Sequence, residues 1–128
     1  MLISMISAAA KIYSKTVFAI HLDHGTQEHA FQSIESGAYT SVMIDASHES
    51  FENNISITKQ VVEKAHEKNI AVEAELGVLS GVEDDLEVDE KNKKYTQSVE
   101  VEEFVKRTNC DSLAVAVCTS HGAFYPRF

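Results

Sequence analysis

Four short apolar runs divide the chain and indicate buried strands. They are rich in Val, Ile and Ala and are mostly continuous instead of alternating, which is typical of strands covered on both faces of a parallel sheet. The predicted strands are Val17–Leu22, Ser41–Ile44, Ile70–Leu76 and Ser112–Val117.

Helical patterns lie before and between these runs. Each predicted helix except the first begins at a residue whose side chain can cap it and ends at a residue that tolerates the left-handed conformation. The predicted caps are Thr26, Ser50 and either Thr96 or Ser98, and the predicted ends are Gly37, Asn69 and Asn109.

The apolar positions of these helices recur at the helical period, so each helix has one face that should be buried. The first fifteen residues form a further predicted helix. The predicted inward positions are Leu2, Ile6, Ala9 and Tyr13, then Ala30 and Ile34, then Ile55, Thr58, Val62 and Ala65, and finally Val101, Phe104 and Val105.

Alternating strands and helices predict an α/β fold of right-handed βαβ units around a parallel sheet. One segment, residues 78–95, interrupts the alternation, because it is strongly acidic and has no stable periodicity. A connection of that length is usually functional or disordered, and a solvated surface loop is the simpler reading from composition alone.

Composition narrows the class of protein. The chain is 44% apolar and 24% charged, with a formal net charge of -9 and no cluster of Lys and Arg, which argues against a nucleic-acid partner. The apolar start, Met1 to Ala10, lacks a basic n-region and is too short to span a bilayer. We therefore expect a soluble, cytoplasmic protein in which Cys110 and Cys118 are reduced thiols.

Polar side chains follow every predicted strand, at the edge where parallel α/β folds bind ligands. Histidine and carboxylate groups without thiolates favour zinc or a similar divalent ion. Glu73 and Glu75 should point to the same side of their strand.

Some of these residues have structural interpretations. Structural roles are preferred for His29, His48 and His66, and Asp45 is explained equally well as a residue that caps the turn after its strand or as a metal ligand. The strand-end residues are His21, Asp23 and His24; Asp45, Ser47 and His48; Glu73 and Glu75; and Thr119, Ser120 and His121.

Several motifs together resemble the class II, zinc-dependent fructose-bisphosphate aldolases. Phe18–Gly25 is similar to the first signature of that family, and Val72–Gly77 with Gly81 and Glu83 is similar to the second. Ser41–Asp45 and Thr119–Phe124 resemble further blocks, in the expected order. The resemblance implies a partial (β/α)8 TIM barrel, in which residues 1–128 form one incomplete domain equivalent to strands three to six with their helices.

The resemblance also implies roles for individual residues. His24 and His121 would bind the catalytic Zn²⁺, and Asp45 and Glu75 would bind metal at a neighbouring or alternate position. Asp23 would be the acid/base at the carbon–carbon bond, and Glu83, on the acidic loop 78–95, would exchange a proton with the dihydroxyacetone phosphate carbon. His21 and Gly122 would contact the substrate, with a second divalent or a monovalent cation as a further ligand.

The implied reaction is reversible aldol cleavage of fructose bisphosphate, and tagatose bisphosphate is the alternative substrate. The resemblance also implies that the full-length protein forms a homo-oligomer. The chain departs from the family pattern at Ser80, Cys118 and Tyr125. A phosphate-binding Lys is typical at the position of Tyr125, and Arg127 is a nearby residue that offers a substitute positive charge. Two hypotheses therefore stand: part of an aldolase, or a non-catalytic remnant that only binds metal.

Overall fold

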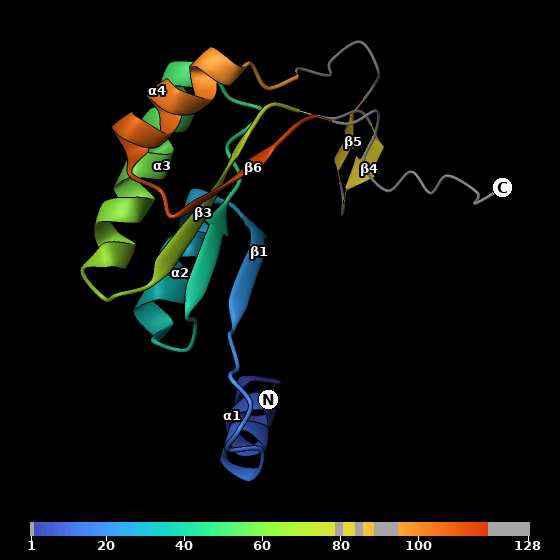
Figure 1. Cartoon of the computed structure of the whole chain (residues 1–128), viewed down its shortest axis with the longest axis vertical. Helices are drawn as coiled ribbons and strands as arrows, with labels where there is room; N and C mark the ends of the chain where they lie inside the picture. The colour runs from blue at the N-terminus through green and yellow to red at the C-terminus, as the bar shows by residue number, and fades with distance from the viewer. Residues whose placement is uncertain (1, 79–80, 84–85, 89–94, 118–128) are drawn as a thin grey trace, which may run out of the picture.

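The computed structural model describes residues 2–78, 81–83, 86–88 and 95–117. Within these ranges helices and strands alternate in the predicted order, except that two extra strands precede the last helix (Figure 1). The elements are α1 (Leu2–Ile12), β1 (His21–Gly25), α2 (Gln27–Ser36), β2 (Ser41–Ile44), α3 (Phe51–His66), β3 (Ala71–Leu76), β4 (Gly81–Glu83), β5 (Leu86–Val88), α4 (Ser98–Thr108) and β6 (Ser112–Val115).

The strands β1, β2, β3 and β6 form one parallel sheet in that order, which confirms the predicted α/β class. Four strand limits differ from the prediction: β1 begins at His21 and ends at Gly25, β3 begins at Ala71, and β6 ends at Val115. The strands β1 and β6 are the outer strands of the described sheet and pair on one side only, so fewer ladder hydrogen bonds define their ends. Val17 and Val117, predicted as strand residues, are 96% and 70% exposed.

The hydrophobic core lies on one face of the sheet, where α2, α3 and α4 pack (Figure 1). Successive strand residues point to opposite faces, so alternate positions of β3 enter this core while Glu73 and Glu75 face the other side. The buried core side chains include Ile34, Val42, Ile44, Val61, Val62, Ala65, Val72, Ala74, Leu76 and Phe104.

The helix ends follow the predicted local chemistry at all but two positions: the start of α4, and the end of α3, which is capped by Glu67 and not by Asn69. The Thr26 and Ser50 hydroxyls accept hydrogen bonds from the backbone N–H groups of His29 and Asn53. Gly37, Asn69 and Asn109 adopt positive φ angles of 66°, 56° and 58°. The cap of α4 was predicted wrongly, because Gln97 occupies it without a side-chain bond.

Thr96 is not a cap because it connects two strands instead. Its hydroxyl donates to the Leu76 carbonyl and accepts from the backbone N–H of Ala116. Two inward positions were also wrong: Val105 is 37% exposed and Tyr13 is 61% exposed. Tyr13 follows α1, which lies apart from the sheet and its covering helices (Figure 1).

The acidic segment 78–95 contains regular structure that the sequence pattern did not reveal. β4 and β5 pair in antiparallel fashion, with Gly81 opposite Val88 and Glu83 opposite Leu86. Three residues in each strand are too few for a period of two to be recognised.

No helix in the described part of the chain is long and apolar enough to cross a membrane.

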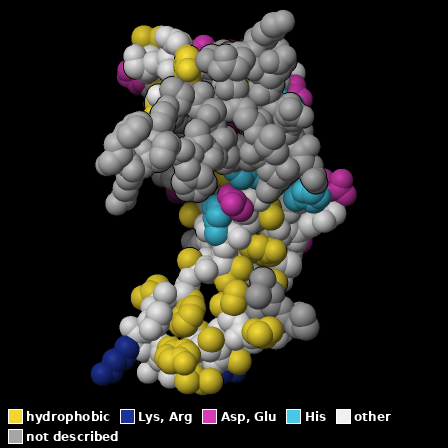
Figure 2. Space-filling view, turned by 90° about the vertical axis from the view of Figure 1, so that its right-hand side faces the viewer, with side chains coloured by type: hydrophobic (Ala, Val, Ile, Leu, Met, Phe, Trp, Pro, Cys, Tyr) yellow, Lys and Arg dark blue, Asp and Glu magenta, His cyan; other side chains and the backbone are white. Residues whose placement is uncertain are grey.

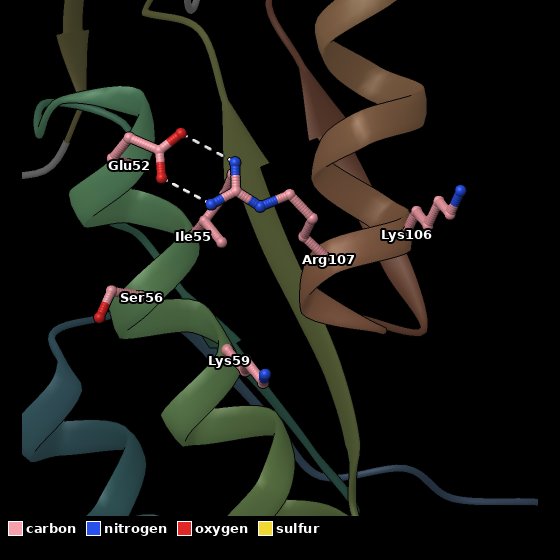
Figure 3. A pocket seen from close by; sticks show the side chains of 6 residues that line it. All are labelled: Glu52, Ile55, Ser56, Lys59, Lys106 and Arg107. Carbon is pink, nitrogen blue, oxygen red and sulfur yellow. Dashed lines mark hydrogen bonds and ion pairs between the residues drawn. The ribbon is translucent and has the colours of Figure 1, made fainter.

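An ion pair joins the outer helices α3 and α4. Arg107 donates from Nη1 to Glu52 Oε1 at 2.8 Å and from Nη2 to Glu52 Oε2 at 2.5 Å (Figure 3). The hollow beside this pair is lined by residues of α3 and α4 alone. It therefore lies outside the strand ends, where the candidate chemistry was predicted.

Asn54 links α3 to the end of β3 through a buried amide. The residue is 1% exposed, its Nδ2 donates to the Glu75 carbonyl at 2.9 Å, and its Oδ1 accepts from the Thr58 hydroxyl at 3.1 Å. A buried polar group is unfavourable without a hydrogen-bond partner, so the Asn54 amide and the Glu75 carbonyl stabilise one another. The amide therefore fixes the position of the β3 backbone at Glu75.

Replacing Asn54 with Ala is expected to lower the free energy of unfolding by about 1–3 kcal/mol, since the Glu75 carbonyl loses its buried partner. Asn53, the exposed neighbour, supplies a matched control whose Ala variant should stay within about 0.5 kcal/mol of the unmodified chain. Urea unfolding followed by circular dichroism measures both. Equal losses in the two variants would contradict the proposed anchoring.

Candidate metal centre

Three side chains that are far apart in the sequence meet at the carboxyl ends of neighbouring strands. His24 lies in β1, Asp45 directly follows β2, and Glu75 lies near the end of β3. One ligand atom from each lies within 4.8 Å of the other two. His24 Nδ1 is 3.3 Å from Asp45 Oδ2 and 3.6 Å from Glu75 Oε2. We call this set the His24–Asp45–Glu75 cluster.

The backbone of β1 is distorted where it places His24. The register with β2 shifts between Leu22 and Gly25, and His24 adopts a φ of 43°, a conformation that non-glycine residues seldom adopt. A Cβ atom on Gly25 would lie 2.5 Å from Leu22 Cδ2 and 2.9 Å from the Met43 carbonyl oxygen. The glycine therefore permits the close approach that keeps β1 against β2 beyond the irregularity.

The carboxylate of Asp45 is largely buried yet stabilised as an anion. Burial raises its pKa, but this is outweighed by hydrogen bonds from the backbone N–H and hydroxyl of Ser47 and from His24, so the pKa lies below its usual value. The side chains of His24, Asp45 and Glu75 are 20%, 15% and 16% exposed. The cluster thus combines an ionised carboxylate with partial access from solvent.

The donor set of the cluster fits a divalent metal ion. It contains one imidazole and two carboxylates, and zinc accepts both kinds of ligand. His24 Nδ1 faces both carboxylates, so a metal ion shared by the three residues would take Nδ1 as its imidazole donor and would replace the His24–Asp45 hydrogen bond. Two acidic side chains in a partly buried position are also stabilised by a positive charge between them.

A second polar group lies on the same face of the sheet, one step toward the amino ends of the strands. His21 Nδ1 lies 2.8 Å from the Ser41 hydroxyl, and His21 Nε2 lies 3.7 Å from Glu73 Oε2. Strand alternation predicted that Glu73 and Glu75 share a face. The structure places His21 beside Glu73, adjacent to the His24–Asp45–Glu75 cluster. Figure 2 shows histidine and acidic side chains next to one another on one side of the molecule.

The remaining predicted site residues lie at the margin or beyond it. The Asp23 side chain is 81% exposed, with Oδ1 4.0 Å from His24 Nε2. The backbone of Glu83 lies in β4, while its side chain, His121 and Gly122 are outside the described residues. The sequence did not identify Asn54 as a supporting residue, although an Asn four positions before a core Thr in an amphipathic helix is a usable signal.

Comparison with known proteins agrees with the strand-end motifs. The family described as fructose-bisphosphate aldolase class-II matches residues 1–127. A fructose-bisphosphate aldolase of Helicobacter pylori is 45% identical over 124 residues, which cover 97% of this chain and 40% of the relative. The corresponding enzyme of Thermus caldophilus is 51% identical over 107 residues, covering 83% of this chain and 35% of the relative.

Solved structures place the sheet within a larger fold. A putative fructose-1,6-biphosphate aldolase from Coccidioides immitis superposes with a TM-score of 0.81 at 31% identity, covering 98% of this chain and 44% of the other. The YdjI aldolase from Escherichia coli K12 gives 0.75 at 34% identity, covering 94% and 41%. The four parallel strands match part of the aldolase TIM barrel, as predicted. This chain spans about 40% of the length of the first curated relatives, and it belongs to the class II fructose-bisphosphate aldolase family.

Proposed function

We propose that this chain carries part of the active site of a cytoplasmic, zinc-dependent aldolase that reversibly cleaves fructose bisphosphate to dihydroxyacetone phosphate and glyceraldehyde 3-phosphate. The observation that carries the proposal is the convergence of His24, Asp45 and Glu75 at the carboxyl ends of three parallel strands. That edge is where TIM barrels place their catalytic groups. Membership of the class II family supports the choice of reaction.

The proposed metal ligands are His24 and His121, with Asp45 and Glu75 as ligands at the same or a neighbouring position. When bound, the metal ion supplies a Lewis acid that stabilises the negative charge developing on a substrate oxygen. The hydrogen bonds from Ser47 hold Asp45 as an ionised acceptor beside His24. The Asn54 amide holds the β3 backbone at Glu75, so two strand ends are fixed before any ligand binds.

Asp23 is proposed as the acid/base that exchanges a proton with the oxygen at the bond being cleaved. Its exposure and its 4.0 Å separation from His24 Nε2 place the carboxylate next to the cluster without burying it, so a substrate can reach it. Glu83, from the acidic segment 78–95, is proposed to exchange the proton at the dihydroxyacetone phosphate carbon. His21 and Gly122 are proposed to contact the substrate.

Zinc binding by the purified chain tests the proposed ligands. The His24→Ala variant should bind zinc at least about tenfold more weakly than the unmodified chain, because it loses the central imidazole of the cluster. Asp23→Ala should change the affinity by less than about twofold, because that carboxylate is assigned to proton transfer and not to the metal. Isothermal titration calorimetry with zinc measures each affinity.

His48→Ala is the matched histidine control, because His48 follows the same strand end as Asp45 but is 65% exposed and pairs with Glu49. Unchanged zinc affinity is expected for it. Equal loss in the His24 and His48 variants would contradict the ligand assignment. Loss of zinc from the Asp23 variant would show that an acid/base group had been mistaken for a ligand.

Fructose bisphosphate cleavage by the 128-residue chain alone is expected to be unmeasurable. Catalytic zinc sites normally use three protein ligands with an open position, and this chain spans only 40% of the length of its H. pylori relative. A coupled assay for dihydroxyacetone phosphate, with that full-length relative as the positive control, makes the comparison. Zinc-dependent turnover by the short chain would contradict the expectation.

A further inference from the structure

The two oxygens of the Asp45 carboxylate have different partners. Oδ1 accepts two hydrogen bonds from Ser47, one from the backbone N–H at 3.0 Å and one from the hydroxyl at 2.8 Å. Oδ2 lies 3.3 Å from His24 Nδ1, which is itself 3.6 Å from Glu75 Oε2. One carboxylate oxygen therefore faces the turn after β2, and the other faces the His24–Asp45–Glu75 cluster.

Ser47 uses the whole acceptor capacity of Oδ1. A carboxylate oxygen has two lone pairs, and the N–H and O–H groups of Ser47 occupy both. The bond to the backbone two residues on is the local turn that aspartate commonly forms. A turn cap and a metal ligand are thus compatible roles for Asp45, because each role uses a different oxygen.

We propose, on the basis of the metal site proposed for this cluster, that Ser47 is a positioning residue that restricts Asp45 to a single metal–oxygen bond through Oδ2. The restriction makes the cluster selective for zinc over calcium. With Nδ1 of His24 and an oxygen of Glu75, Asp45 Oδ2 completes a set of three ligand atoms. Catalytic zinc sites typically draw that number from the protein and keep one position open.

The number of oxygens that Asp45 offers decides between the two ions. Zinc usually has about four ligands, whereas calcium takes about six to eight oxygens and often binds both oxygens of one carboxylate. Removal of the Ser47 hydroxyl would free one lone pair of Oδ1, so that Asp45 could bind an ion through both oxygens. The additional oxygen ligand favours the larger ion.

Zinc titration of the full 128-residue chain by isothermal calorimetry, with and without a large excess of calcium chloride, tests the proposal. Ser47→Ala should bind zinc at least about tenfold more weakly than the unmodified chain, because Asp45 loses a hydrogen bond that orients it as a ligand. Excess calcium should weaken zinc binding to this variant at least about threefold more than it weakens binding to the unmodified chain.

Two further serine variants separate positioning from a general loss of structure. Ser47→Thr keeps the hydroxyl and the backbone N–H, so it should restore the zinc affinity and the calcium response of the unmodified chain. Ser50→Ala is the matched control, because the Ser50 hydroxyl bonds to the backbone N–H of Asn53 in the same connection. Its loss weakens the cap of α3 but should change neither metal measurement. A lower zinc affinity in Ser47→Ala without a changed calcium response would overturn the proposed selectivity.

Asp45→Asn decides the question if Ser47→Ala does not fold, as judged by circular dichroism and cooperative unfolding. The Asn side chain has one acceptor oxygen, which the two Ser47 donors should hold, so that the amide NH2 group faces His24. Asp45→Asn should therefore lose as much zinc affinity as Asp45→Ala. A substantially smaller loss in the Asn variant would show that Ser47 does not hold that oxygen, and would overturn the proposal.

The same titrations distinguish the role of Ser47 from the metal site itself. Zinc binding by the unmodified chain with an unchanged affinity and calcium response in Ser47→Ala would overturn the role of Ser47 and leave the metal site standing. Absence of zinc binding by the unmodified chain would overturn the metal site, and the role of Ser47 with it.

Discussion

Parallel pairing of β1, β2 and β3 is the constraint on which the candidate site depends. The register sets Ser41 beside His21 and Ala71, so the three strands end at nearly the same level and deliver His24, Asp45 and Glu75 to one rim. The irregularity in β1 then turns His24 toward the two carboxylates. Without level strand ends, residues 21 and 30 positions apart could not offer ligand atoms within 4.8 Å of one another.

The two faces of the sheet have different chemistry, and each accounts for a different property. Aliphatic residues face α2, α3 and α4 and form the core, which supplies the stability that holds the strand ends in place. The other face carries polar side chains that lie beside one another, His21 next to Glu73 and His24 next to Glu75. The four-stranded sheet matches part of the aldolase barrel, an architecture in which this second face is interior.

Much of the fold follows from short-range signals in the sequence. Thr26 and Ser50 cap their helices because the groups they bond lie three residues away, and the run Ser41–Ile44 is a strand throughout because both neighbours pair with it. Predictions failed where distant contacts decide: Thr96 bonds to Leu76 and Ala116, twenty residues away on either side, instead of capping α4. Asn54 was missed for the same reason, because its partner is a backbone carbonyl twenty-one residues along the chain.

The candidate site was predicted in its composition but not in its geometry. The sequence grouped His24, Asp45 and Glu75 at one edge, whereas the exposure of Asp23 and the pairing of His21 with Ser41 and Glu73 depend on how neighbouring strands align. X-ray absorption at the zinc edge of the zinc-loaded chain tests the central assignment most directly. Nitrogen and oxygen neighbours at about 2.0–2.2 Å are expected, from imidazole and carboxylate ligands. A sulfur neighbour at about 2.3 Å would instead place the metal on cysteine and contradict the His24–Asp45–Glu75 cluster as the site.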